Sequence, residues 1–161
     1  MRVILRWVSS ASDTVEESVT GRIGDGMLIF LGIHKSDTKA DAAWLAQKIA
    51  ALRIFANDAD RMNRSLAELA ASSPPSLDAA KPTVLVVSRF TLFSSTRKDA
   101  RPTFNDAAPT QVAVPLYESF FAQLEGLLGT PVATGKFGAM MNVSLVNNGP
   151  VTILLDSKLK E

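Results

Sequence analysis

The stretch GMLIFLGIHKSD, residues 26–37, decides the fold. Its apolar run at residues 27–33 has the length of a strand and predicts a β-strand. Ser36 or Asp37 then offers a side-chain oxygen that can cap the start of a helix. The glycines just before the run, in G-R-I-G-D-G, are not a dinucleotide-binding fingerprint, because they precede a strand and open no helix. The stretch therefore predicts a strand that leads into a helix.

The helical spacing of apolar residues predicts two main helices. The first runs from its cap at Ser36 or Asp37 to about Leu52, and the second lies within residues 109–128. Pro115 has no N–H and damages the interior of a helix, so the second helix is expected to begin near Pro115 or to kink there. The expected apolar faces consist of Ala42, Leu45, Ile49 and Leu52 in the first helix and Leu116, Phe120, Leu124 and Leu127 in the second.

Strands are expected to outnumber the helices. We expect them at residues 2–8, around a turn within residues 13–22, after Leu52, from Val84 onward, and on both sides of a corner at residues 147–150. Residues 67–83 are small, polar and rich in proline, which predicts an exposed loop. No internal repeat is present. The fold class is mixed α and β, of the α+β type, with a largely antiparallel sheet and two main helices.

Length and charge bound the possible functions. The chain has 161 residues, which predicts a single domain spanning residues 1–161. Its net charge of +1 forces no broad basic face, so a nucleic-acid partner would have to be bound by a local cluster. No run approaches the roughly 18 apolar residues that a membrane helix needs. Arg6 also interrupts the apolar start, unlike a signal peptide, so we expect a cytoplasmic protein without a membrane partner.

Two residue counts exclude several kinds of catalytic site. The chain has no cysteine, which excludes disulfides, thiol nucleophiles and zinc sites built from cysteine. His34 is the only histidine, so a Ser-His-Asp triad would have to use it, and a histidine-rich metal site cannot be built. We expect His34 at the surface end of a strand. We expect neither a metal nor a cofactor.

A second stretch, VNNGPVTILLDS at residues 146–157, interrupts apolar runs with Asn147, Asn148, Gly149 and Pro150. Asn-Gly and Gly-Pro are common turn-forming pairs, so a plain turn is one interpretation. The other interpretation is that the backbone of Gly149 and Pro150 itself forms part of a site.

At VVSRFTLFSSTRK and VSLVNNGPVT together, the chain resembles the D-aminoacyl-tRNA deacylases, formerly called D-tyrosyl-tRNA deacylases. Asn147, Gly149, Pro150 and Thr152 match that family's Asn-x-Gly-Pro-x-Thr motif. S-R-F-T-L at residues 88–92 stands where the family has a Ser-Gln-x-x-Leu-type motif. The likeness runs almost end to end, through GDGMLIFLGIHKSDT, LRIF, RPTFNDAAP and TGKFGAMMNVSLVNNGPVTILLDS.

The chain departs from the family's pattern at three places. Arg89 stands where the family usually has glutamine. An arginine that the family carries near its N-terminus falls at Trp7, and Arg6 precedes it; side-chain alternation along a strand turns Arg6 to the opposite face. The loop at residues 70–81 is longer than is typical of the family.

The resemblance implies an activity and an assembly. The activity is hydrolysis of the ester that joins a D-amino acid to the ribose of the 3′-terminal adenosine of tRNA, and of glycyl-tRNA mischarged on tRNA-Ala. The implied fold has a barrel-like sheet, and the implied assembly is a homodimer in which Gly149 and Pro150 reach the partner's active site. If their peptide bond is cis, both carbonyls can face a pocket that admits an α-hydrogen and excludes an L side chain.

Ser88, Phe90 and Thr91 are the expected catalytic residues. Ser88 or Thr91 as a covalent nucleophile would need a nearby base, and the sequence offers only the distant His34. The resemblance implies RNA-assisted catalysis instead, which is more consistent with the lack of a nearby base. In that mechanism the 2′-hydroxyl of the adenosine positions or activates water, and the N–H groups of Phe90 and Thr91 stabilise the oxyanion.

The remaining expected contacts fall into two groups, each with a plain structural alternative. Substrate contacts are expected from Arg89, Gly149 and Pro150, and adenine contacts from Phe137, Met140 and Met141. Phe and Met also fill gaps in any core, so ordinary packing is the alternative for the last three. Arg97, Lys98 and Arg101 are expected to meet tRNA phosphates without reading sequence; the alternative is a solvated loop.

Three rival functions stay open at this point. The departure at Arg89 allows a non-catalytic module that binds aminoacyl-tRNA or RNA ends. Ser88 allows a serine-type esterase. A purely structural dimer would bind no ligand and would have a trans peptide bond before Pro150.

Overall fold

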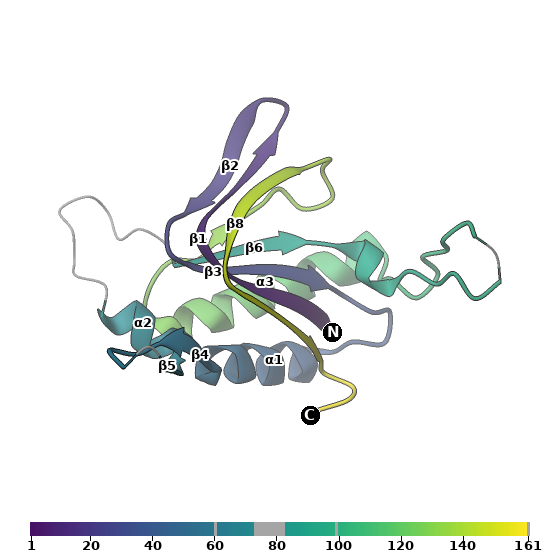
Figure 1. Ribbon diagram of the computed structural model, residues 1–161. Coiled ribbons are helices and arrows are strands. Elements are labelled where there is room, and N and C mark those ends of the chain that lie inside the picture. Colours follow the sequence, from purple (N-terminus) through teal and green to yellow (C-terminus); the bar gives the residue numbers. More distant parts are fainter. Residues whose placement is uncertain (60, 73–82, 99, 161) are drawn as a thin grey trace.

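The computed structural model describes residues 1–59, 61–72, 83–98 and 100–160, and these form three α-helices, one 3-10 helix and two sheets (Figure 1). The elements in chain order are β1 (Arg2–Val15), β2 (Ser18–Ile23), β3 (Gly26–Gly32), α1 (Lys39–Ala51), β4 (Arg53–Ala56), β5 (Met62–Ser65), α2 (Leu66–Ser72), β6 (Val84–Ser88), the 3-10 helix η1 (Phe90–Phe93), α3 (Thr110–Leu128), β7 (Ala133–Thr134) and β8 (Asn142–Asp156). The predicted mixed α+β class is confirmed.

Strand β1 organises the larger sheet, because it pairs along both of its edges. On one edge, its first half pairs antiparallel with β3 and its second half with β2. On the other edge it pairs antiparallel with β8, from Arg2 to Thr14. β3 then pairs in parallel with β6, and β6 with β7. The order is therefore β2-β1-β3-β6-β7, with β8 beside β1.

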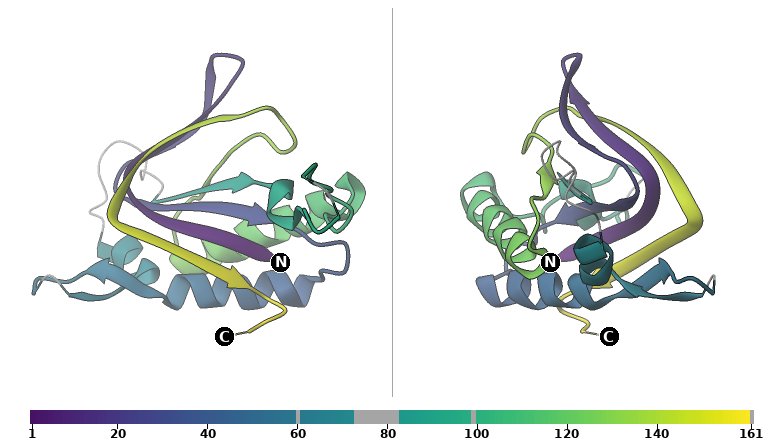
Figure 2. Two further views of the ribbon diagram at one scale, coloured as in Figure 1. Left: turned by 45° about the vertical axis from the view of Figure 1, so that its right-hand side comes forward. Right: turned by 90° about the vertical axis from the view of Figure 1, so that its left-hand side faces the viewer.

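The sheet curls until its two ends approach each other. Figure 2 shows β1 and β8 curving together around the interior of the sheet. An added Cβ on Gly21 of β2 would lie 3.1 Å from the carbonyl oxygen of Thr134 in β7, so these two strands are in close contact. The sheet has the predicted barrel-like form and is nearly closed.

The two faces of the sheet carry two hydrophobic clusters. The helix face packs against α1 and α3, and its buried residues include Leu5, Ile29 and Val86 from the sheet and Leu45, Ile49, Phe120 and Leu124 from the helices. The opposite face, which we call the inner face, holds a smaller cluster of Val8, Ala11, Ile23, Leu28, Phe30, Leu85 and Val87. The seven residues of β3 are all buried because the strand is covered on both faces.

Both predicted helices are present, and α3 lies within the predicted residues 109–128. Thr38, rather than Ser36 or Asp37, caps α1, because its side chain and that of Asp41 form a reciprocal capping box. Helix α3 begins at Thr110 and continues through Pro115, so it does not begin near the proline.

The buried stripe of α3 also differs from the prediction at one position. Leu127, expected on the stripe, is 45% exposed, because the buried positions advance in steps of four from Phe120 to Leu124 and Leu128. Tyr117 joins the stripe instead and donates its hydroxyl to the carbonyl oxygen of Val86 at 3.0 Å.

The expected loop at residues 67–83 begins as a helix. α2 buries Leu66 and Ala70. The N–H of Ser65 donates to the carboxylate of Glu68 at 2.6 Å, and the N–H of Glu68 donates to the hydroxyl of Ser65 at 3.2 Å. The sequence S-L-A-E thus carries a capping-box signal that favours a helix over a loop. The rest of the predicted loop, residues 73–82, lies outside the described residues.

Two strand predictions in the second half of the chain are wrong. β6 ends at Ser88 instead of continuing through Arg89 and Thr91, because its partner β3 ends at Gly32 and leaves no strand to pair with. The residues on both sides of the corner at 147–150 belong to one strand, β8, because both sides pair with β1. The corner is therefore not a hairpin turn between two strands.

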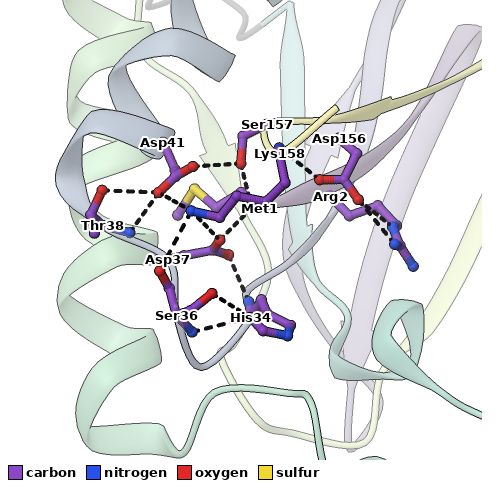
Figure 3. A network of polar contacts seen from close by, with 10 residues as sticks. All are labelled: Met1, Arg2, His34, Ser36, Asp37, Thr38, Asp41, Asp156, Ser157 and Lys158. Atoms are coloured by element: carbon purple, nitrogen blue, oxygen red, sulfur yellow. Dashed lines mark hydrogen bonds and ion pairs between the residues drawn. The ribbon is translucent and has the colours of Figure 1, made fainter. Parts of the chain in front are cut away.

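A network of polar contacts fastens the end of the chain to the start of α1 (Figure 3). The ammonium of Met1 donates a hydrogen bond to the hydroxyl of Ser157 at 2.6 Å. It also forms an ion pair with Oδ1 of Asp37 at 2.7 Å, although this contact lacks the geometry of a hydrogen bond. Ser157 and Lys158 each donate to Asp41 at 2.8 Å. Burial raises the pKa of Asp41, but hydrogen bonds from Lys158, Ser157 and the helix cap outweigh it and hold that pKa well below its ordinary value.

Candidate active site

The S-R-F-T-L stretch forms a tight turn at the end of β6. Ser88 is the last residue of β6, and η1 folds back over the end of β3. Gly32 permits this close approach, since an added Cβ there would lie 2.9 Å from the Cβ of Leu92 and 3.1 Å from the carbonyl oxygen of Arg89. A side chain at residue 32 would push the turn away from the sheet.

Two neighbouring N–H groups at this turn have no acceptor. The N–H of Arg89 donates to the carbonyl oxygen of Leu31 at 2.7 Å, and the N–H of Leu92 donates to the carbonyl oxygen of Arg89 at 3.3 Å. Between them, the N–H groups of Phe90 and Thr91 donate to nothing in the part of the chain that the structure describes. Adjacent backbone donors of this kind can bind a negatively charged oxygen.

Among the described residues, no base forms a hydrogen bond with the hydroxyl of Ser88 or Thr91. Both residues are half-buried, and neither hydroxyl forms a hydrogen bond with another described residue. His34 is engaged elsewhere: its Nδ1 lies 2.8 Å from the hydroxyl of Ser36, and its ring packs at 5.2 Å against Phe93. The site therefore lacks the arrangement that activates a serine or threonine nucleophile.

The Asn-Asn-Gly-Pro corner is a bulge in the ladder between β8 and β1. Asn147 pairs with Val8 and Thr152 pairs with Arg6, so residues 148–151 stand opposite Trp7 alone. The extra residues have no partner on β1 and project from the strand.

The side-chain amide of Asn147 closes this bulge. Its Nδ2 donates to the carbonyl oxygens of Trp7 at 2.8 Å and Val151 at 3.1 Å, with a longer contact of 3.3 Å to Asn148. Its Oδ1 accepts a hydrogen bond from the hydroxyl of Thr152 at 3.3 Å. Asn147 and Thr152 of the Asn-x-Gly-Pro-x-Thr motif thus fix the loop that carries Gly149 and Pro150.

Gly149 and Pro150 lie exposed at the tip of the bulge, joined by a cis peptide bond. Gly149 has a φ of +102°, which residues with a Cβ rarely adopt. An added Cβ would also lie 2.7 Å from a methyl group of Val151. The backbone itself therefore requires glycine at this position.

Within one copy of the chain, the turn and the bulge form separate patches. Ser88 lies in the row of the sheet that contains Leu31 and Val3, whereas the bulge lies beside Trp7. Four residues of β1 separate these rows, or about 13 Å at the usual rise of a strand. β1 and β3 also lie between β8 and β6.

The three side chains expected at the adenine diverge. Phe137 packs edge-on against Tyr117, with ring centroids 5.4 Å apart. Met141 packs against the cluster of the inner face. Met140 is 93% exposed, so of the three it is the side chain with the most freedom to contact a ligand.

Residues 94–98 and 100–107 form an arm that projects from the body beside η1, at the right of Figure 1. Exposed cationic side chains stand on this arm: Arg97, Lys98 and Arg101. At its base, Phe90 and Phe104 are both exposed and pack edge-to-face, with ring centroids 5.0 Å apart. The arm therefore places aromatic and cationic groups next to the turn.

The structure shows contacts of Asn147 and Trp7 that the sequence did not predict, and it shows on which face Arg6 lies. Trp7 packs on the helix face against Phe55, with ring centroids 5.7 Å apart, and its Nε1 donates a hydrogen bond to Oδ1 of Asp25 at 3.0 Å. Arg6 lies on the inner face, opposite Leu28, as predicted from alternation. The bonds of Asn147 went unpredicted, although an asparagine at a turn commonly bonds to nearby backbone.

The chain matches the family model described as D-Tyr-tRNA(Tyr) deacylase over residues 4–156. It is 53% identical over 161 residues to a D-aminoacyl-tRNA deacylase of Opitutus terrae, with both chains fully covered. It is 50% identical to the D-aminoacyl-tRNA deacylase of Roseiflexus castenholzii over 159 residues, which covers 99% of this chain and 94% of the relative.

Two solved structures share the fold. The c-Myc DNA Unwinding Element Binding Protein superposes with a TM-score of 0.83 at 33% identity, over 97% of this chain and 98% of the other. A probable eukaryotic D-amino acid tRNA deacylase superposes with a TM-score of 0.77 at 16% identity, over 96% of this chain and 97% of the other. Among the described residues, the structure contains no helix that could span a membrane. By its sequence, the chain belongs to the D-aminoacyl-tRNA deacylase family, and it is an ester hydrolase that acts on D-aminoacyl-tRNA.

Proposed function

We propose that the chain proofreads the chirality of aminoacyl-tRNA through a main-chain barrier at Gly149 and Pro150. The observation that carries this proposal is the bulge itself, pinned by the amide of Asn147 and exposing its tip. A barrier must be stiff, and proline supplies stiffness; it must come close to the α-carbon of the substrate, and glycine leaves room for that.

Selection by this barrier works by exclusion. An α-hydrogen fits against the carbonyl groups of Gly149 and Pro150, whereas the side chain of an L-amino acid collides with them. The D side chain points away, so its identity matters little. Glycine has no side chain to collide, so glycyl-tRNA mischarged on tRNA-Ala is also a substrate.

Hydrolysis proceeds with help from the RNA. Water adds to the ester carbonyl, and the resulting oxyanion is held by the N–H groups of Phe90 and Thr91. The intermediate then expels the ribose 3′-oxygen, which takes a proton and leaves a free amino acid and tRNA. The 2′-hydroxyl of the terminal adenosine positions or activates the water. The absence of a base beside Ser88 among the described residues favours this route over a covalent one.

The working site is assembled from two copies of the chain. The separation of the turn from the bulge within one copy supports this arrangement, in which the bulge of one subunit enters the site of the other. Strand β8 also leaves its outer edge unpaired among the described residues, with Val146 58% and Leu154 60% exposed. Such an edge is suited to cover by a second copy.

The remaining predicted residues bind the RNA. Met140, the most exposed of the three side chains expected at the adenine, contacts the terminal adenine, and Arg89 contacts the substrate beside the turn. The cationic side chains of the arm, Arg97, Lys98 and Arg101, contact phosphates without reading sequence. A protein with this substrate works in the cytoplasm.

A deacylation assay tests the proposal with one tRNA carrying a D-amino acid, its L-enantiomer or glycine. Each ester is made with and without the terminal 2′-hydroxyl. We expect fast release from the D and glycyl esters, slow release from the L ester, and a large loss without the 2′-hydroxyl. Equal rates for D and L esters would refute the barrier, and an acyl-enzyme on Ser88 would refute the RNA-assisted route.

A further inference from the structure

We propose that Arg6 and Arg89 form a paired binding site for an anionic oxygen group of the substrate on the inner face of the sheet. This inference rests on the proposed function and adds a ligand group to it. The proposed mechanism gives Arg6 no role and assigns no ligand group to Arg89.

Arg6 is held in position without a partner for its charge. It lies on the inner face, between Leu28 of β3 and Thr152 of β8. Its Nε is buried and has no hydrogen-bond partner, and none of its side-chain nitrogens forms an ion pair with a described residue. A buried donor that bonds to nothing is costly, so it marks a place where a ligand oxygen would be stabilising.

Arg89 approaches the same face from the turn. Its guanidinium carbon lies 5.0 Å from the centre of the ring of Phe30, which is part of the inner-face cluster. Stacking on an aromatic ring orients a guanidinium group and leaves the N–H groups, which lie in the plane of the guanidinium, free to form hydrogen bonds. The side chain is exposed and forms no ion pair within the described ranges.

The register of the sheet brings the two arginines toward each other. Phe30 pairs with Ile4, and Leu28 pairs with Arg6, so Arg6 is the diagonal neighbour of Phe30 on the same face. Diagonal neighbours lie about 7–8 Å apart, which long side chains can bridge. Arg6 therefore stands next to the ring that carries Arg89.

Neither guanidinium forms an ion pair with a described carboxylate. Asp156, on the ladder between β1 and β8 that also holds Arg6, pairs with Arg2 at 2.9 Å. Two adjacent guanidinium groups without an acid between them repel each other and attract an anion. The pair thus has the chemistry of a carboxylate or phosphate site.

An acylated tRNA end offers this chemistry from two sources. One is the 5′-phosphate of the terminal adenosine. The other is the side-chain carboxylate of D-aspartate or D-glutamate. Guanidinium groups bind both kinds of anion through paired N–H···O bonds.

Binding of four stable analogues distinguishes the sources. Each analogue is 3′-amino-3′-deoxyadenosine that carries either D-aspartate or D-asparagine as an amide, with or without a 5′-phosphate. Amides resist hydrolysis, so calorimetry reports affinity independently of catalysis. Deacylation of D-aminoacyl-tRNA by the wild-type protein is measured in parallel, and its failure would count against the proposed function itself.

We expect the anionic member of one matched pair to bind the wild-type protein about tenfold tighter than its neutral counterpart. If the analogues with a 5′-phosphate bind more tightly, the site binds the RNA. If the D-aspartate analogues bind more tightly than the D-asparagine ones, the site binds acidic amino acids. Arg6→Gln and Arg89→Gln are each expected to remove most of this advantage. Arg22→Gln is the control, since Arg22 is exposed on β2 and its side chain forms no hydrogen bond or ion pair with other described residues.

Three results would overturn the paired site. They are the lack of any advantage in the wild-type protein, an advantage that survives in either single variant, and deacylation by a protein that binds none of the four analogues. Thermal unfolding verifies that the variants fold. If Arg6→Gln does not fold, Arg6→Lys, which keeps the charge but not the paired N–H geometry, replaces it and is expected to weaken the advantage.

Discussion

The network at the start of α1 and the inner face of the sheet differ in whether their charged side chains form ion pairs within the fold. In the network, the ammonium of Met1 faces Asp37 and the ammonium of Lys158 faces Asp41. On the inner face, Arg6 and Arg89 face no carboxylate among the described residues. Charges satisfied within the fold stabilise it, whereas charges left unsatisfied are available to a ligand. Changes in the first region should therefore alter stability, and changes around the second should alter activity.

The largest expected effect comes from Gly149→Ala at the tip of the bulge. Its φ of +102° and the contact with Val151 force an alanine to move the main chain. A displacement of this kind typically costs about 100-fold in a precisely positioned site. We expect the ratio of D to L hydrolysis to fall by about that factor, measured on matched D- and L-aminoacyl-tRNA.

Gly126→Ala in α3 is the matched control for this change. Gly126 has no atom within 4 Å of an added Cβ, and its backbone is helical. Alanine there should raise the stability slightly and leave the D to L ratio unchanged. An unchanged ratio in Gly149→Ala would mean that the bulge is not the barrier.

The next largest effect concerns stability. Asp41→Asn removes the charge that holds Lys158 and weakens the bond from Ser157, at a side chain that is only 8% exposed. We expect the free energy of unfolding to fall by about 2 kcal/mol, measured by urea denaturation. Deacylation of D-aminoacyl-tRNA should be unchanged. A loss of activity in a fully folded variant would break the contrast between the two regions.

The same carboxylate makes stability depend on pH. The pKa of Asp41 is lower in the folded protein than its ordinary value of 3.8. Its contribution to stability is therefore complete above pH of about 4 and is lost as the pH falls further toward the lowered pKa. Urea denaturation between pH 5 and 3 should show a steeper loss for the wild-type protein than for Asp41→Asn. Parallel curves would contradict this role of Asp41.

A smaller effect on stability is expected from Asn147→Ala. The substitution leaves the carbonyl oxygens of Trp7 and Val151 without their donor. We expect a loss of about 1 kcal/mol in the free energy of unfolding and about tenfold in the rate of D-aminoacyl-tRNA hydrolysis. Asn147→Asp retains the oxygen that accepts from Thr152 but loses the amide donor, so it should resemble alanine. Full activity in both variants would show that the bulge keeps its shape without the amide.

The smallest effect is expected at the base of the arm. Lys35 and Asp106 form an ion pair of 2.9 Å, with both side chains 54% exposed. Exposed pairs contribute little and are screened by salt. Lys35→Ala should change the melting temperature by no more than about 1 °C. A larger shift would mean that the arm is coupled to the core of the protein.

The sequence predicted best those features that depend on local pattern. The apolar run of β3 and the spacing of Leu45 and Ile49 in α1 were sufficient to identify both elements. The S-L-A-E capping box of α2 is equally local, but the loop prediction rested only on the small, polar and proline-rich composition of residues 67–83. Alternation along a strand also placed Arg6 correctly on the face opposite Trp7.

The sequence could not predict features that depend on a distant partner. β8 is one strand because β1 pairs with both of its halves, and nothing near Pro150 reveals that. β6 stops at Ser88 because β3 stops at Gly32, more than fifty residues earlier. The stacking of Arg89 on Phe30 likewise depends on the parallel register of two strands. The residues of the candidate site could be named from sequence motifs, but the bond from Asn147 to the carbonyl oxygen of Trp7 could not, because Trp7 lies 140 residues earlier.

The pairing of the first long strand with the last one also bears on synthesis. Arg2 pairs with Asp156, so one edge of β1 stays open until β8 has left the ribosome. Contacts between residues so distant in sequence form slowly, and an open strand edge invites pairing with other chains. The nascent protein is therefore prone to aggregate until β8 has been synthesised, and a chaperone that shields β1 during that time would have its greatest effect on yield.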